Sequence, residues 1–219
     1  MGIYTQYQKG GCKVFEQVLP GNTKAVLALL EKSEVIQKAY LAGGTALALQ
    51  LGHRISYDLD FFTQEEFDAE MLLPEIEEIS DFQLEKISWR TILGKFEDVK
   101  FSIFYYKYPL LYAAKKFGMI KITDIRDIAA MKIAAIASRG TKRDFVDLYF
   151  ICKEIVTLPD AIQLYDKKYK NLATTEIHIM KSLVYFEDAE SDEMPKMLKK
   201  AEWEDVKKYF EDEVRRLVK

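Results

Sequence analysis

The stretch Gly43–Phe62, which reads GGTALALQLGHRISYDLDFF, decides the fold. Its residues predict a glycine turn, a short helix over 45–52, a loop and a strand. Gly43 and Gly44 let the backbone approach a ligand closely. Thr45 is a good N-cap for the helix that follows. Because the backbone amides at a helix start attract anions, the turn predicts a phosphate site beside the strand.

The strand, expected over 57–62, carries two carboxylates. Asp58 and Asp60 flank Leu59, so an extended backbone directs both carboxylates to one face. Paired hard oxygen ligands suit Mg2+ that also holds nucleotide phosphates. The apolar neighbour Phe61 predicts a largely buried strand, in which carboxylates need hydrogen bonds, paired charges or a metal. Two solvated aspartates at a strand end are the alternative, but the pattern favours a metal site and nucleotidyl transfer.

The composition is that of an ordinary globular protein. The 219 residues are enough for one domain or two small ones, and 49% of them are hydrophobic. No apolar run is long enough to span a membrane, and the N-terminal residues do not show the apolar region of a signal peptide. Cys12 and Cys152 resemble no disulfide or metal framework. We therefore expect a cytoplasmic protein that makes no membrane contact.

The charge distribution leaves room for a local anion-binding patch. The net charge of −3 argues against a protein with a wholly basic, nucleic-acid-binding surface. Basic residues nevertheless form three groups: Lys115, Lys116 and Lys121; Arg139, Lys142 and Arg143; and Lys167, Lys168 and Lys170. We interpret the third group as a solvated face.

Hydrophobic periodicity predicts a mixed first half and a helical second half. The first half is expected to hold helices over 24–32, 34–39 and about 63–79, strands over 40–42, 82–88, 91–93 and 99–105, and a turn over 94–98. The second half is expected to hold helices from 123 or 124 to 138 and over 142–153, and to be helical throughout from about 160 to 219. This layout is an α+β fold with an α/β domain over 1–120 and a helical region over 121–219.

Two segments together resemble a known family. Gly43–Phe62 and the later segment Asp127–Phe150 resemble the AbiEii/AbiGii-type nucleotidyltransferases, the toxin half of bacterial abortive-infection and type IV toxin–antitoxin systems. The resemblance covers roughly residues 40–155. It implies a polymerase-β-like core, a small mixed sheet flanked by helices. It also implies Mg2+-dependent transfer of a nucleotide from an NTP to an acceptor such as the 3′ end of tRNA, and an antitoxin partner from the same operon.

The resemblance assigns roles to particular residues. Gly43, Gly44 and Thr45 match the triphosphate-binding turn, and Asp58 and Asp60 match the metal ligands. Lys132 matches a lysine that contacts the nucleotide phosphates, and Asp147 matches a late acidic residue required for activity.

Simpler explanations remain open for several of these residues. Arg54 is as well placed for a structural salt bridge as for phosphate binding. Without the resemblance, Lys132 would be expected to extend to solvent from an apolar helix. Asp144 could merely complement the helix dipole. Asp147 needs a cationic partner, with Lys132, Arg139 and Arg143 as the choices, and such a partner could make it purely structural.

One departure from the family pattern concerns the third carboxylate of polymerase-β-like enzymes. The expected position on the strand 99–105 is Ser102, and a serine hydroxyl is a poor base at neutral pH. Two alternatives to nucleotidyl transfer follow. One is a non-catalytic nucleotide sensor on the same fold, and the other is a phosphotransferase that moves the γ-phosphoryl group.

Overall fold

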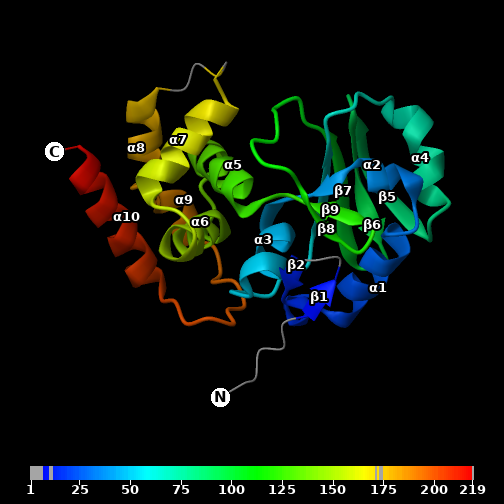
Figure 1. The fold of residues 1–219 in the computed structure, drawn as a ribbon, viewed down its shortest axis with the longest axis horizontal. Coiled ribbons are helices and arrows are strands. Elements are labelled where there is room, and N and C mark those ends of the chain that lie inside the picture. Colours follow the sequence, from blue (N-terminus) through cyan, green and yellow to red (C-terminus); the bar gives the residue numbers. More distant parts are fainter. Residues whose placement is uncertain (1–6, 10–11, 171, 173–174, 219) are drawn as a thin grey trace. The chain divides into compact units, whose positions relative to one another are not determined.

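The computed structural model describes residues 7–9, 12–170, 172 and 175–218 (Figure 1). The chain divides into two compact units. Unit 1 comprises Met1–Pro109 and Ala113–Thr123, and unit 2 comprises Leu110–Tyr112 and Asp124–Lys219.

Unit 1 is built on a seven-stranded mixed sheet with the order β5-β6-β7-β4-β3-β9-β8. The strands are β3 (Tyr40–Leu41), β4 (Leu59–Thr63), β5 (Phe82–Ser88), β6 (Thr91–Phe96), β7 (Val99–Tyr105), β8 (Lys115–Phe117) and β9 (Ile120–Ile122). The pairs β4–β7 and β3–β9 are parallel, and the other pairs are antiparallel. The expected α+β class with a mixed sheet is therefore confirmed. A separate hairpin joins β1 (Tyr7–Lys9) and β2 (Cys12–Val14).

The two faces of the central strands differ in burial. Leu59 and Phe61 on β4 are fully buried, whereas Asp60 and Phe62, which point the other way, are half-buried. Strand β6 shows the same alternation, because Ile92 is fully buried and its neighbour Leu93 is half-buried. The period of two follows from the pleat of the strand. One face is thus part of the core, and the more open face carries Asp60.

Among the described helices of unit 1, those that contact strands of the sheet are α1 (Gly21–Leu30), α2 (Glu34–Lys38), α3 (Gly43–Leu51) and α4 (Ala69–Glu77). Helix α1 begins at Gly21, three residues before the expected start, with Pro20 as its N-cap. The helix expected over 63–79 is shorter at both ends and ends at Glu77. It begins only at Ala69, because the Asp68 carboxylate caps it by accepting hydrogen bonds from the amides of Glu70 and Met71. The short 3-10 helix η1 (Glu16–Val18) precedes α1.

Three strands of the sheet, β6, β8 and β9, differ from expectation. The turn predicted over 94–98 is confirmed only for Glu97 and Asp98, because β6 continues to Phe96 and pairs with β7 along its length. Gly94 lies inside this strand, where an added Cβ would come within 2.4 Å of the backbone oxygen of Gln83. Glycine is therefore required there by close packing, and the pattern was misread as a turn signal. Strands β8 and β9 were not predicted, since three residues give too short an alternation to detect.

Unit 2 is helical. Its helices are α5 (Ile125–Ser138), α6 (Lys142–Glu154), α7 (Leu158–Lys168), α8 (Glu176–Ser182), α9 (Glu187–Glu190) and α10 (Trp203–Leu217). Of the two expected caps, Thr123 and Asp124, it is Asp124 that caps α5, by accepting from the Arg126 amide. The expectation of helix throughout 160–219 is wrong for 191–202, which holds no helix. None of the described helices is long and apolar enough to cross a membrane.

The excursion Leu110–Tyr112 is a short segment that belongs to unit 2, although the residues on both sides of it belong to unit 1. A buried ion pair in unit 2 holds it in place. The Lys168 ammonium lies 2.7 Å from Asp127 Oδ1, and both side chains are fully buried. The same carboxylate accepts hydrogen bonds from the backbone amides of Leu111 and Tyr112, at 3.0 and 2.9 Å. The interpretation of Lys168 as part of a solvated face is therefore wrong. The Asp127 carboxylate thus accepts from three donors, the Lys168 ammonium and two backbone amides, which would otherwise lack this partner.

We expect Asp127→Ala to destabilise unit 2 by about 3–5 kcal/mol, because it leaves the Lys168 ammonium buried and uncompensated. The double variant Asp127→Ala/Lys168→Met should recover part of that loss, since no buried charge remains. Urea denaturation followed by circular dichroism measures both. Equal stability of wild type and Asp127→Ala would contradict this structural role.

Candidate active site

The centre of the candidate site in unit 1 is the pair Asp60 and Ser102. Strands β4 and β7 run parallel with Asp60 directly opposite Ser102. The Ser102 hydroxyl donates a hydrogen bond to Asp60 Oδ1 at 2.5 Å. Ser102 is buried, so this hydroxyl is held in place. The position expected for a third carboxylate is therefore occupied by a donor that orients the Asp60 carboxylate.

Gly43 packs against the other oxygen of the same carboxylate. An added Cβ on Gly43 would lie 3.1 Å from Asp60 Oδ2, and the Ala42 amide donates to the Asp60 carbonyl at 2.9 Å. Gly43 has φ of +65°, a conformation that side chains disfavour. The glycine turn and the acidic strand, 17 residues apart in sequence, thus meet at Asp60.

Helix α3 (Gly43–Leu51) begins at Gly43 with Ala42 as its N-cap. The prediction that Thr45 caps this helix is wrong. Thr45 lies inside the first turn and is buried. Its hydroxyl donates to the Asp58 carbonyl and lies 2.7 Å from the Ser56 hydroxyl. Thr45 therefore fixes the loop that leads into β4.

Arg54 also contributes to that loop. Its guanidinium donates to the Ile55 carbonyl at 3.0 Å and to the Ser56 hydroxyl at 3.3 Å, and the residue is 4% exposed. These bonds favour the structural explanation. A phosphate contact of Arg54 stays a prediction.

The donor set of unit 1 suits a hard divalent ion that shares its coordination with a substrate. Asp58 directly precedes β4, and Asp60 is its second residue. Among the described residues, no three or more His, Cys, Asp or Glu side chains converge as a complete metal site. Mg2+ is commonly held by one or two carboxylates and completed by substrate phosphates and water. Two aspartates beside a glycine turn fit that mode of binding.

A second group of predicted residues lies in unit 2. The Lys132 ammonium lies 2.9 Å from Asp144 Oδ1 and 2.6 Å from Asp147 Oδ2. Asp147 is fully buried, and the side chain of Lys132 is 8% exposed. The expectation that Lys132 extends to solvent in the absence of a family role is wrong. Of the three candidate partners for Asp147, Lys132 forms an ion pair with it.

Asp144 does more than complement the dipole of α6. Its carboxylate also accepts from the Arg139 guanidinium at 2.9 and 3.2 Å and from the Thr141 hydroxyl at 2.7 Å. Burial by itself would raise the pKa of Asp144, but Lys132 and Arg139 outweigh it and hold that pKa well below the usual range. Asp144 is thus a permanent anion that, with Asp147, fixes the direction of the Lys132 ammonium. Thr141 was not singled out from the sequence, although its place as N-cap of α6 is a recognisable signal.

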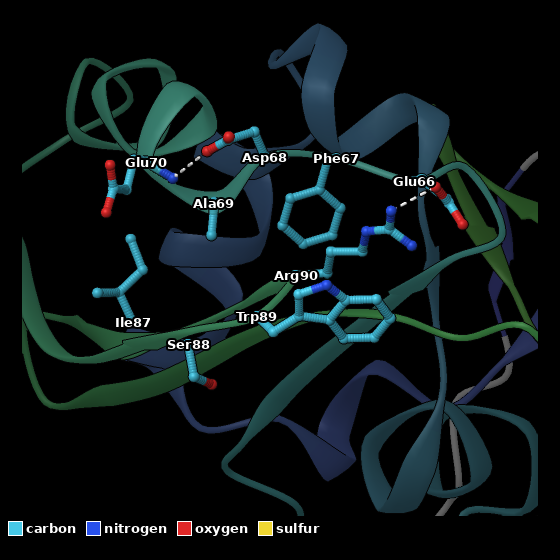
Figure 2. Close-up of a pocket in the computed structure, with 9 residues that line it drawn as sticks. All are labelled: Glu66, Phe67, Asp68, Ala69, Glu70, Ile87, Ser88, Trp89 and Arg90. Carbon is cyan, nitrogen blue, oxygen red and sulfur yellow. Dashed lines mark hydrogen bonds and ion pairs between the residues drawn. The ribbon is translucent and has the colours of Figure 1, made fainter.

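Unit 1 also contains a hollow of about 650 Å3 at the tip of the β5–β6 hairpin. It is lined by Glu66–Glu70 and Ile87–Arg90, and Figure 2 shows Arg90 reaching Glu66 beside the Trp89 ring. Three carboxylates in the lining disfavour a triphosphate. None of the predicted site residues lines it.

We expect Gly43→Ala to weaken divalent metal binding and nucleotidyl transfer by roughly tenfold or more, because a Cβ strains the backbone and crowds Asp60 Oδ2. Gly21→Ala is the matched control, since an added Cβ there meets nothing within 4 Å. Isothermal titration with Mn2+ and a transfer assay measure the two effects. Equal behaviour of the two variants would remove the glycine turn from the site.

Comparison with known proteins identifies the family. The family model for the nucleotidyl transferase AbiEii toxin of type IV toxin–antitoxin systems matches residues 25–122 and 82–216. The uncharacterized protein aq_aa25 of Aquifex aeolicus (strain VF5) is 40% identical over 181 residues, which cover 80% of this chain and 86% of that protein.

Two solved structures show the same fold. JHP933 from Helicobacter pylori aligns with a TM-score of 0.51 at 18% identity, over 93% of this chain and 97% of that one. A second H. pylori chain, described as a candidate nucleotidyltransferase, aligns with a TM-score of 0.51 at 18% identity, over 90% and 96% of the two chains. Because the family model matches most of the chain, the chain belongs to the AbiEii nucleotidyl transferase toxin family, and it is a nucleotidyltransferase.

Proposed function

We propose that this protein transfers a nucleoside monophosphate from an NTP to an acceptor hydroxyl, with Mg2+ as the metal and RNA as the acceptor. The observation that carries the proposal is the Asp60 carboxylate, which is held by Ser102 on one oxygen and faces Gly43 with the other. A carboxylate fixed in this way beside a helix start suits a metal–triphosphate complex.

Each residue of the site has its own proposed role. Asp58 and Asp60 would hold the metal ion, which would neutralise charge on the triphosphate and help to activate the acceptor hydroxyl. The backbone amides that follow Gly43 bind phosphate oxygens. An acceptor hydroxyl then attacks the α-phosphorus, and pyrophosphate leaves. Positioning and charge stabilisation provide most of the rate in such a reaction.

Lys132 is proposed to contact the triphosphate as a point charge. Asp147 then acts by orienting that lysine. A general-base role is less favoured, because the buried Asp147 carboxylate is already paired with the Lys132 ammonium at 2.6 Å. Asp144, in the first turn of α6, and Arg139, at the end of α5, support the same arrangement.

The family also supports a cognate antitoxin as a partner in the cell. Co-expression of the chain with the neighbouring gene of its operon tests this partner, by relief of growth arrest.

Radiolabelled nucleotides test the reaction. Each α-32P-labelled NTP is incubated with the protein, Mg2+ and total RNA, and wild type is compared with Asp58→Ala/Asp60→Ala. Transfer of label into RNA, lost in the double variant, supports the proposal. Label that transfers only from γ-32P-labelled NTP identifies a phosphotransferase instead. Metal-dependent NTP binding without any transfer favours the sensor.

Ser102 provides a further prediction within this proposal. We expect Ser102→Ala to weaken Mn2+ binding and transfer by roughly tenfold, about the worth of one hydrogen bond to a charged group. Ser102→Thr keeps the hydroxyl and should restore most of both. Full activity of Ser102→Ala would show that Asp60 needs no orienting donor.

A further inference from the structure

The face of the sheet that carries Asp60 also carries a pair of lysines. Phe62, two residues after Asp60, pairs with Tyr40, and Tyr40 pairs in turn with Lys121. Lys121 is directly opposite Lys116 on the edge strand β8. Because residues paired across neighbouring strands point to the same side of a sheet, both lysines share the open face with Asp60.

This lysine pair is unfavourable for the fold by itself. Like charges directly opposite each other on neighbouring strands destabilise a sheet. Both lysines are exposed, and within the part of the chain that the structure describes no carboxylate lies in ion-pair distance of either. The segment 113–123 contains three lysines and no Asp or Glu. Lysine on an edge strand can serve to block aggregation, which accounts for Lys116 on β8 but leaves Lys121 on the inner strand β9 unexplained.

A second pair of opposed lysines in this sheet lies beside a carboxylate. Lys95 and Lys100 also face each other, on β6 and β7, but Lys95 is neutralised by Glu85 at 2.6 Å. The hollow of Figure 2 is acidic. The β8–β9 flank is therefore the part of this face that is suited to an external anion.

The spacing of the strands indicates an extended anion. Strand β9 is two strands from β4, and β8 is three strands from it. At about 4.8 Å per strand, Lys121 and Lys116 lie about 10 and 14 Å across the sheet from strand β4, which carries Asp60. A polynucleotide backbone, which bears one charge per nucleotide, can reach from these lysines to the carboxylate.

We propose that Lys116 and Lys121 bind the phosphate backbone of a single-stranded RNA acceptor whose 3′ end reaches Asp60. The proposal rests on the proposed function for the position of the reaction. It adds the surface that binds the acceptor. Binding by lysine point charges is largely independent of sequence and falls steeply with salt.

The test measures RNA binding directly, without turnover. Fluorescence anisotropy follows a fluorescein-labelled single-stranded RNA across a series of NaCl concentrations, for wild type and Lys116→Gln/Lys121→Gln. Lys24→Gln/Lys32→Gln is the matched control, because it makes the same charge change at two exposed residues, one in α1 and one in the turn that follows it. We expect the first variant alone to bind about tenfold more weakly. Its log–log salt slope should fall by about 1.4, or about 0.7 per lost phosphate contact on a single strand.

Three results would overturn the proposal. The first is equal RNA affinity of the two double variants, and the second is no RNA binding by wild type. The third is a loss of NTP affinity in Lys116→Gln/Lys121→Gln, measured by calorimetry. The last result would assign the lysines to the nucleotide instead. Melting temperatures of all variants confirm folding. Label transfer from NTP, scored separately with RNA and with protein as acceptor, judges the proposed function independently of these outcomes.

Discussion

Asp60→Asn is expected to lower the rate of nucleotidyl transfer by about 10^3-fold or more while leaving the fold intact. The amide is isosteric with the carboxylate, so the Ser102 hydroxyl keeps an acceptor on strand β4. What is lost is the negative charge that would hold a divalent ion next to Gly43. The measurement is single-turnover transfer from α-32P-labelled NTP at saturating metal concentration.

Asp98→Asn is the matched control for this prediction. Asp98 is an exposed residue of the β6–β7 turn, and its substitution removes the same charge from the same unit. Transfer should be unchanged in this control. If Asp60→Asn retained more than about a tenth of the wild-type rate, Asp60 would not be a metal ligand.

Lys132→Met is expected to affect both stability and activity. It leaves Asp147 buried without its closest cation, which should cost about 3–5 kcal/mol of unfolding free energy. The double variant Lys132→Met/Asp147→Leu removes both charges and should recover most of that stability. Urea denaturation of the two variants measures this recovery.

Activity separates the two roles of Lys132. If the lysine contacts phosphate, the stable double variant should remain at least about 10^2-fold slower than wild type. A double variant that regains both stability and transfer would identify the Lys132–Asp147 pair as purely structural. Lys132→Arg is informative as well, because it keeps the positive charge but replaces the compact ammonium with a planar guanidinium.

Local signals in the sequence predicted much of the fold. Helix α5 with its Asp124 cap and strands β5 and β7 were predicted from side-chain period and capping. The errors arose where tertiary packing determines the conformation. Gly94 was read as a turn residue, whereas its missing side chain makes room for Gln83 and Phe82. Strands β8 and β9 have three residues each, so only their partners define them.

The candidate site was predictable in its residue types but not in its contacts. The pairing of Asp60 with Ser102 depends on the parallel register of β4 and β7, which strand propensity does not encode. Lys168 and Asp127 are 41 positions apart in the chain, and no local pattern distinguishes their buried ion pair from a solvated lysine cluster. Thr45 fits the pattern of a cap, but the helix begins two residues earlier because Gly43 can adopt positive φ.

The excursion Leu110–Tyr112 has a consequence for how the protein can be divided. The chain passes between the two units three times, after Pro109, after Tyr112 and after Thr123. A protein ending at Thr123 would keep the whole sheet but lose Asp127, which accepts from the amides of Leu111 and Tyr112. Unit 1 therefore cannot be expressed alone without exposing Leu110–Tyr112, a segment that belongs to unit 2. A single protease cut after Thr123 would leave the two fragments held together by the hydrogen bonds to Asp127.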